Sequence, residues 1–247
     1  MLNCLLLVLS RRSSRVRRPL SGLGFLEVGC GGGILSESLA VLGARVTAID
    51  AAKESILVAK EHAKRNALIT TTLSDENIHD KDKDKDKDKD GEDTQMGKLT
   101  YLATTAEALQ ESLASGDGHE EGDEDGLYDV VVSSEVIEHV VNPPAFCKTL
   151  ASLVKPGGLV ILSTLNRTIW SYSLAIVAAE DVLGMAPKGA HEWDQFVTPE
   201  ELSIMCKDAG LELEVISGMK WNIAKMQFEL SEDKSINYIA AFTKPAS

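Results

Sequence analysis

The sequence lacks paired cysteines and long hydrophobic runs. Its four cysteines, Cys4, Cys30, Cys147 and Cys206, are scattered without a C-x-x-C pair, so their spacing indicates neither a disulfide framework nor a zinc finger and favours a reducing compartment. The apolar run at 5–9 is far shorter than the roughly 20 residues needed to span a bilayer. The length of 247 residues, 44% of them hydrophobic, is typical of one globular domain.

The sequence also lacks an excess of basic charge. Its formal net charge is −13, but residues 75–125 hold 18 of the 38 acidic side chains and only 6 of the 25 basic ones. The rest of the chain is therefore nearly neutral, and its charge gives no argument for binding nucleic acid. Two acidic stretches, at about 74–97 with its Lys-Asp repeat and at 115–126, have no apolar face to bury. We expect both to be disordered surface insertions.

The N-terminal stretch 1–23 contains no acidic residue and five arginines. This composition suits a mitochondrial transit segment, whereas a secretory signal would place its positive charge before the apolar run. The alternative is an artefact of gene prediction. We treat 1–23 as an Arg-rich leader and expect one domain over 24–247.

A glycine-rich turn is the most informative feature present. An apolar strand at 25–28 runs into Gly29-Cys30-Gly31-Gly32-Gly33, a helix follows at 34–42, and a second strand at 45–49 ends on Asp50. In such a β-α-β unit, glycines let backbone N–H groups approach a nucleotide, and the acid accepts hydrogen bonds from ribose hydroxyls. We interpret Cys30 as a small filler of the turn and not as a nucleophile.

The glycine spacing separates the candidate cofactors. A dinucleotide fingerprint needs a third glycine at position 34, where this chain has Ile34, so an NAD-dependent enzyme is disfavoured. The pattern Gly29-x-Gly31-x-Gly33 instead resembles the first motif of class I S-adenosylmethionine-dependent methyltransferases. A glycine-rich loop without a ligand is the alternative.

Strands and helices alternate along the remaining sequence. We expect seven strands, with helices at 34–42, 51–66, 106–113 and 143–154, forming a doubly wound, Rossmann-like α/β sheet. The expected strands are 25–28, 45–49, 98–103, 128–133, 159–164, 211–217 and 238–243. Ligands of such sheets bind outside the carboxyl ends of the strands, which places Gly29, Asp50, Ser134 and Asn166 around one crevice.

Glu135, Glu138 and His139 follow the fourth expected strand at positions i, i+3 and i+4. If this turn is helical they share one face, and two carboxylates with one imidazole can hold Mg²⁺, Mn²⁺ or Zn²⁺. A cation there would lower the pKa of a catechol hydroxyl and orient it toward a methyl group. Many methyltransferases have a Glu-His pair at this point and use no metal, so both interpretations stay open.

Five stretches together resemble ubiquinone-biosynthesis O-methyltransferases. Three of them, 27–35, 134–140 and 153–158, contain the glycine turn, the acidic segment and Lys-Pro-Gly-Gly. The more specific two are Ser-Thr-Leu-Asn-Arg-Thr at 163–168 and Ala-Pro-Lys-Gly-Ala-His-Glu-Trp-Asp-Gln-Phe-Val at 186–197. The similarity covers 24–244, apart from the two acidic insertions.

The resemblance implies an S-adenosylmethionine-dependent enzyme that methylates polyprenylated catechols, namely 3,4-dihydroxy-5-polyprenylbenzoate and 3-demethylubiquinol. It implies peripheral contact with the matrix side of the mitochondrial inner membrane, in a complex with other ubiquinone-biosynthesis proteins. The positions matching the family's site are Gly29, Gly31, Asp50 and Ser134 for the cofactor, and Glu135, Glu138 and His139 for Mg²⁺.

Three parts of the family pattern leave alternatives open. The family has helices before its first strand, with an arginine that contributes to the cofactor site, and residues 1–23 offer no match for it. An inactive scaffold subunit or a metal-independent small-molecule methyltransferase therefore remain alternatives. Apolar, aromatic 169–177 suggests an interfacial helix or a lid, or else an ordinary helix on the sheet. His191 is a candidate general base, a substrate contact or a plain loop histidine.

Overall fold

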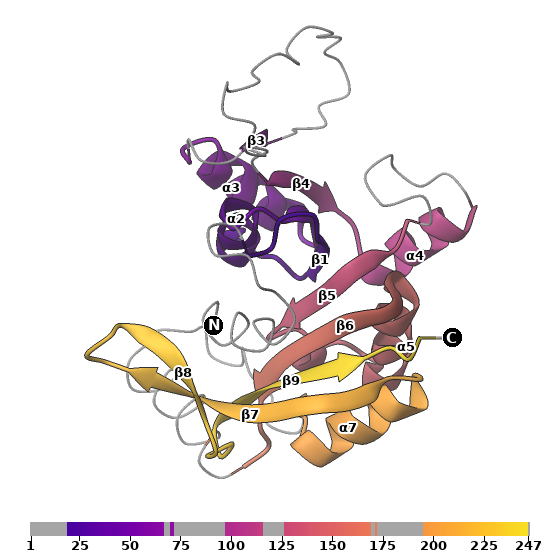
Figure 1. The fold of residues 1–247 in the computed structure, drawn as a ribbon, viewed down its shortest axis with the longest axis vertical. Coiled ribbons are helices and arrows are strands. Elements are labelled where there is room, and N and C mark those ends of the chain that lie inside the picture. The colour runs from indigo at the N-terminus through magenta and orange to yellow at the C-terminus, as the bar shows by residue number, and fades with distance from the viewer. Residues whose placement is uncertain are drawn as a thin grey trace, which may run out of the picture.

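The computed structural model describes residues 19–66, 70–71, 97–115, 126–168, 171 and 195–246. The expected leader (apart from 19–23), nearly all of both acidic insertions, the stretch 169–177 (apart from Ser171) and His191 lie outside these residues. Within them, nine strands form one sheet in the order β3-β4-β2-β1-β5-β6-β9-β7-β8 (Figure 1). The first strand therefore lies inside the sheet, with later strands added on both sides of it.

The first half of the fold builds the sheet in parallel. Its elements are β1 (Gly24–Val28), α2 (Ile34–Val41), β2 (Arg45–Asp50), α3 (Lys53–Ala63), β3 (Thr70–Thr71), β4 (Lys98–Ala103) and α4 (Ala106–Ser115). Strand β1 pairs in parallel with β2 and with the later strand β5, so that Val28 lies beside both Ile49 and Ser133. The carboxyl ends of these three strands consequently meet at one edge.

The second half adds two parallel strands and an antiparallel end to the sheet. Its elements are β5 (Tyr128–Ser134), the 3₁₀ turn η1 (Ile137–His139), α5 (Pro143–Leu153), β6 (Val154–Leu165), α7 (Pro199–Asp208), β7 (Glu212–Asn222), β8 (Gln227–Ser231) and β9 (Asn237–Thr243). Strand β6 pairs in parallel with β5, and Ser134 lies beside Ser163. Strand β9 runs antiparallel between β6 and β7.

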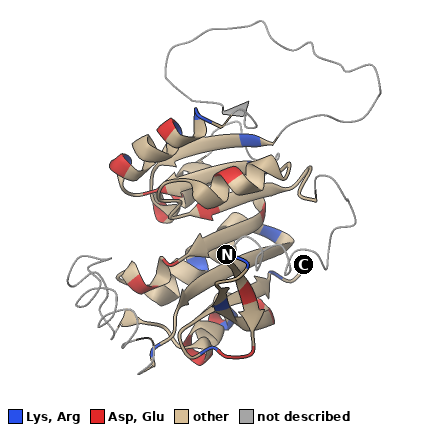
Figure 2. Ribbon diagram, turned by 90° about the vertical axis from the view of Figure 1, so that its left-hand side faces the viewer, with Lys and Arg blue, Asp and Glu red and all other residues tan. Residues whose placement is uncertain are grey.

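The core is divided between the two faces of the sheet. Helices α2 and α3 pack into one cluster of buried side chains, and α4, α5 and α7 pack into the other. Along β5, Val130 and Val132 join the first cluster and Val131 the second, as the alternation of side chains along a strand requires. In Figure 2 the charged residues lie mainly on helices and at strand ends. This two-sided core confirms the expected doubly wound α/β fold.

The structure also contains elements that the sequence analysis missed. All seven expected strands are present, and β3 and β8 are additional. Strand β8 forms a hairpin with β7, in which Trp221 and Phe228 stack edge to face with ring centroids 5.0 Å apart. Helix α7 begins with a capping box, since Thr198 Oγ1 accepts from Glu201 N while the Glu201 carboxylate accepts from Thr198 N. None of the described helices is long and apolar enough to cross a bilayer.

Candidate active site

The glycine turn is tied to β2 by backbone and carboxylate hydrogen bonds. Gly29 N and Cys30 N both donate to Ile49 O, at 2.8 and 3.0 Å. Asp50 accepts from Gly31 N at 2.9 Å and from Ala52 N at 2.8 Å, one bond to each carboxylate oxygen. Because a carboxylate oxygen has two lone pairs, each retains one for a ligand hydroxyl. Asp50 thus orients the turn and keeps acceptor capacity for a ligand.

Close packing explains two of the glycines. Gly33 has φ +81°, and a Cβ there would overlap the ring and hydroxyl of Tyr101, whose Oη donates to Gly33 O at 3.3 Å. Gly29 has φ +78°, and a Cβ there would overlap Val136. The second contact is informative for the site, because Val136 belongs to the acidic segment after β5. The glycine turn and the acidic segment are therefore in contact.

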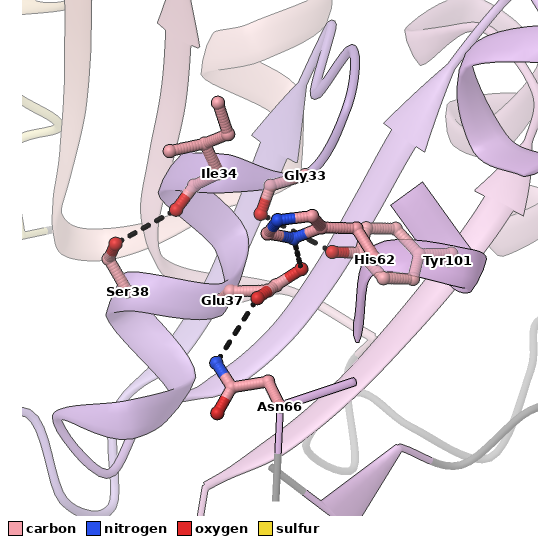
Figure 3. Close-up of polar contacts among 7 residues, drawn as sticks. All are labelled: Gly33, Ile34, Glu37, Ser38, His62, Asn66 and Tyr101. Atoms are coloured by element: carbon pink, nitrogen blue, oxygen red, sulfur yellow. Dashed lines mark hydrogen bonds and ion pairs between the residues drawn. The ribbon is translucent and has the colours of Figure 1, made fainter. Parts of the chain in front are cut away.

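A polar brace fixes the helix that follows the turn. Glu37 on α2 is buried, its Oε1 lies 2.6 Å from His62 Nδ1, and its Oε2 accepts from Asn66 Nδ2 at 3.2 Å. Figure 3 shows these groups converging beside the Gly33–Tyr101 contact. The brace connects α2 with α3 and the residues after it. No local sequence pattern predicts this brace, because Glu37 lies 25 positions from His62 and 29 from Asn66.

A second buried carboxylate lies within β1. Glu27 is 4% exposed and accepts a hydrogen bond from Ser36 Oγ on α2. Burial, opposed in part by this bond and reinforced by the charge of Asp50, raises the pKa of Glu27 to about 7. Burial also raises the pKa of the Cys30 thiol, which disfavours the nucleophilic thiolate and agrees with the interpretation of Cys30 as filler.

The ends of β5 and β6 hold the acidic segment. Ser134 Oγ and Ser163 Oγ lie 2.7 Å apart, Glu135 N donates to Ser163 O at 2.9 Å, and Ser163 Oγ donates to Glu135 Oε1 at 3.3 Å. Glu135 is exposed as a residue, but its carboxyl end faces Ser163 and Glu138. Desolvation there, together with the charge of Glu138, raises the pKa of Glu135 to about 8.

The expectation that Glu135, Glu138 and His139 share one helical face is wrong. Glu135 has a left-handed φ of +55°, and the turn after it is a 3₁₀ helix of three residues. With three residues per turn, neighbouring side chains point about 120° apart, so Glu138 is buried while His139 is exposed. Among the described residues, no three His, Cys, Asp or Glu side chains gather to hold a metal ion. Glu135 and Glu138 form a carboxylate pair that His139 does not complete.

Glu138 is one of three buried side chains near this edge, with Thr164 and Asn237, that have an oxygen without a hydrogen-bond partner among the described residues. It is 3% exposed, and its Oε2 has no hydrogen-bond partner in the part of the chain that the structure describes. The residue lines a pocket of about 680 Å³ between η1, α5 and α7. Asn166, by contrast, lies at the expected edge but donates its side-chain amide to Lys234 O at 2.8 Å. Asn166 therefore anchors the loop before β9.

The structure thus brings Gly29, Gly31, Asp50, Ser134, Glu135 and Glu138 to one edge of the sheet, as the topology predicted.

The sequence profile of the methyltransferase-domain family matches residues 8–215. Two solved structures share the fold. Magnesium protoporphyrin IX methyltransferase from Synechocystis, with S-adenosylhomocysteine bound, matches with a TM-score of 0.57 at 19% identity. The match covers 98% of this chain and 81% of the Synechocystis chain. An S-adenosylmethionine-dependent methyltransferase from Methanosarcina mazei has a TM-score of 0.58 at 17% identity, with 93% and 96% covered. The protein is a class I S-adenosylmethionine-dependent methyltransferase.

Sequence relatives define the family within this class. The mitochondrial ubiquinone biosynthesis O-methyltransferase of Arabidopsis thaliana is 39% identical over 92% of this chain, and this chain spans 58% of its length. The enzymes of the same name from Parvibaculum lavamentivorans and Methylobacterium nodulans are 37% and 38% identical over 92% and 96% of this chain, and 74% and 78% of their lengths are covered. The chain belongs to the ubiquinone biosynthesis O-methyltransferase family.

Proposed function

We propose that this chain transfers the methyl group of S-adenosylmethionine to a hydroxyl oxygen of a polyprenylated catechol in ubiquinone biosynthesis. The observation that supports this most is the contact between Gly29 and Val136 in a member of this family. It places the cofactor turn directly against the segment that carries the Glu135–Glu138 pair. A methyl donor held by the turn and an acceptor held by the carboxylates would then be neighbours.

The cofactor half of the proposed site consists of Gly29, Gly31, Asp50 and Ser134. Asp50 accepts the ribose hydroxyls with its two remaining lone pairs, while the glycines allow the methionine end of the cofactor to approach the backbone. This half is partly ordered before the ligand arrives, because Asp50 and the turn are already hydrogen bonded to each other. Ordering the site on binding therefore costs little.

The acceptor half consists of Glu135 and Glu138. Glu138 Oε2, buried and without a partner among the described residues, accepts a hydrogen bond from the acceptor hydroxyl. In the transfer, the S–CH₃ bond breaks, an O–CH₃ bond forms, and the hydroxyl proton passes to a base. Glu135, with its pKa raised to about 8, suits proton uptake near neutral pH. His191, outside the described residues, stays a second candidate for the base.

A divalent cation, Mg²⁺ in the first place, would be held by Glu135 and Glu138. Two neighbouring carboxyl groups, one of them with an unsatisfied buried oxygen, fit such an ion once both have lost their protons, and hard oxygen ligands are those that Mg²⁺ prefers. His139, expected as the third ligand, is not gathered with them. When bound, the cation supplies acidity to a catechol hydroxyl. The incomplete ligand set favours metal-independent transfer as the second candidate.

The proposed location is the matrix side of the mitochondrial inner membrane, with peripheral attachment and contacts to other ubiquinone-biosynthesis proteins. Two observations support it: the Arabidopsis relative is named as mitochondrial, and residues 1–23 have the composition of a transit segment. Import of a fusion of the chain to a fluorescent protein, followed by carbonate extraction, tests both parts. Failure to enter mitochondria would contradict the proposal.

Calorimetric titration with S-adenosylmethionine, followed by methylation of a short-chain 3,4-dihydroxy-5-prenylbenzoate with and without Mg²⁺, tests the activity. We expect cofactor binding, an O-methylated product, and loss of turnover in the presence of a chelator. Turnover that survives chelation would favour the metal-independent candidate. A folded chain that binds no cofactor would instead be a scaffold subunit. Asp50→Ala serves as the control that loses cofactor binding.

A further inference from the structure

The pocket beside Glu138 has mostly apolar walls, with Glu138, Arg167, Gln195 and Glu201 as the polar residues of its lining. It encloses about 680 Å³ at the carboxyl edge of the sheet, between η1, α5 and α7. Its apolar lining comes chiefly from Val140, Val141, Pro143, Phe196, Ile204 and Met205. This volume is within the range of about 300–1,000 Å³ that small-molecule sites occupy.

The other two charged groups of the lining, Arg167 and Glu201, are already engaged. Arg167 and Glu201 form an ion pair, and the Glu201 carboxylate also accepts from Thr198 N at 3.0 Å in the capping box of α7. Glu138, in contrast, is 3% exposed and has a carboxylate oxygen without a partner among the described residues. The unpartnered oxygen has less than 1 Å² of accessible surface, so the Glu138 side chain must turn toward the pocket to accept from a hydroxyl there. Because a buried acceptor left unsatisfied is costly, that turn relieves a penalty that the protein carries alone.

The open end of the pocket has unusually exposed aliphatic side chains. Val141, which precedes α5, is fully exposed, and Ile204 on α7 is 61% exposed. Each would be removed from water by an apolar chain leaving the pocket, at roughly 25 cal/mol per Å² of buried surface. The site therefore matches an amphiphile with a hydroxyl-bearing head at Glu138 and an apolar tail along these walls.

We propose that this pocket binds the apolar tail of the methyl acceptor, and that Val141 and Ile204 form the rim over which the tail leaves. This inference rests on the proposed function, since it gives the binding site for the tail of the same acceptor. It makes the walls of the pocket specificity determinants: they select acceptors by tail and take no part in the chemical step.

Substitutions at the rim distinguish binding of the acceptor's tail from recognition of its head. We expect Val141→Asn combined with Ile204→Gln to raise KM for a farnesylated catechol about tenfold, because both changes remove aliphatic surface that the tail would cover. Turnover of tail-less 3,4-dihydroxybenzoate and the affinity for S-adenosylmethionine should not change. Leu57→Gln, which alters a similarly exposed leucine on α3, is the matched control and should change none of these quantities.

A binding measurement makes the test independent of turnover. A fluorescent farnesol analogue should bind the wild-type chain saturably, compete with farnesol, and bind the double variant less tightly than Leu57→Gln. Turnover of the farnesylated catechol without any binding of the analogue would overturn the tail site alone. Saturable binding that the rim substitutions weaken, in a chain that methylates no catechol, would overturn the proposed function and leave the tail site standing. Equal losses with both acceptors would also overturn the tail site.

Discussion

The two halves of the proposed site treat their buried polar groups in opposite ways. In the cofactor half, Asp50 accepts from two backbone N–H groups, and on the adjoining helix α2 the Glu37 carboxylate contacts both His62 and Asn66. In the acceptor half, Glu138 keeps an oxygen without a partner among the described residues, and Glu135 lies against it. Asp50 and Glu37 are satisfied before any ligand binds, whereas Glu138 has an unsatisfied oxygen that a ligand could satisfy.

The difference indicates which residues lower the stability of the free protein in favour of its function. A turn that is already bonded presents its N–H groups without reorganisation, so substitutions there should lower stability and cofactor binding together. A desolvated carboxylate pair destabilises the free protein, so substitutions there should separate the two properties. This contrast can be tested residue by residue.

The largest effect is expected for Glu138→Met. The variant should lose about 10²–10³-fold in kcat, or about 3–4 kcal/mol of transition-state stabilisation, because the acceptor hydroxyl loses its buried partner. It should also gain about 1–3 kcal/mol in the free energy of unfolding, since an unsatisfied carboxylate is replaced by an apolar side chain. Steady-state kinetics and urea unfolding give the two numbers.

Glu107→Met, an exposed carboxylate on α4, is the control for Glu138→Met and should leave both quantities nearly unchanged. If Glu138→Met lowered stability along with turnover, Glu138 would be a structural residue in this state of the protein. The contrast between the two halves would then be wrong.

Glu27→Gln tests a buried carboxylate on β1, next to the cofactor half, that has a raised pKa. The pKa of Glu27 is about 7 in the folded chain and near 4.5 when unfolded, so between these values the folded state holds a proton that the unfolded state has lost. The wild-type free energy of unfolding therefore falls as pH rises through this window and then levels off. The free energy of unfolding of Glu27→Gln, minus that of wild type, should therefore be about 3 kcal/mol larger above this pH window than below it.

Unfolding of both chains across the pH range, without cofactor, measures this difference. Because the other groups titrate alike in the two chains, the difference isolates Glu27. A difference that does not vary with pH would mean that the folded protein accommodates the ionised carboxylate, and the cofactor half would then be satisfied throughout.

The cofactor half is predictable from sequence because its signals are local. The glycine turn lies between an apolar strand and a helix, and Asp50 closes the next strand, so a stretch of 26 residues from Phe25 to Asp50 contains the whole unit. The rule that parallel strands bind ligands at their carboxyl ends then predicted the edge of the sheet at which Ser134 lies. Neither step needed a contact between distant residues.

The acceptor half depends on features that the sequence does not display. The spacing of Glu135, Glu138 and His139 suits an α-helix, but a single turn is too short for periodicity to exclude a 3₁₀ helix. Nothing in the sequence indicated the left-handed conformation of Glu135. Helix α7, in contrast, could have been found, since Thr198, Pro199 and Glu201 carry a capping-box pattern.

The smallest effect concerns crowding at the glycine turn, and two matched substitutions isolate it. Gly33 and Gly157 have φ of +81° and +77°, so an alanine at either position carries a similar conformational strain. A Cβ at Gly157 would have no neighbour within 4 Å, whereas one at Gly33 would overlap Tyr101. Gly33→Ala should therefore destabilise the protein by about 2 kcal/mol more than Gly157→Ala.

Only Gly33→Ala should also weaken S-adenosylmethionine binding, because the turn must shift to make room. Adding Tyr101→Phe removes the nearest atom and should recover part of both losses. Urea unfolding and calorimetry on the four chains, wild type included, provide the measurements. Equal destabilisation by the two alanines would show that the turn yields easily, and the cofactor half would then lack the rigidity on which its contrast with the acceptor half depends.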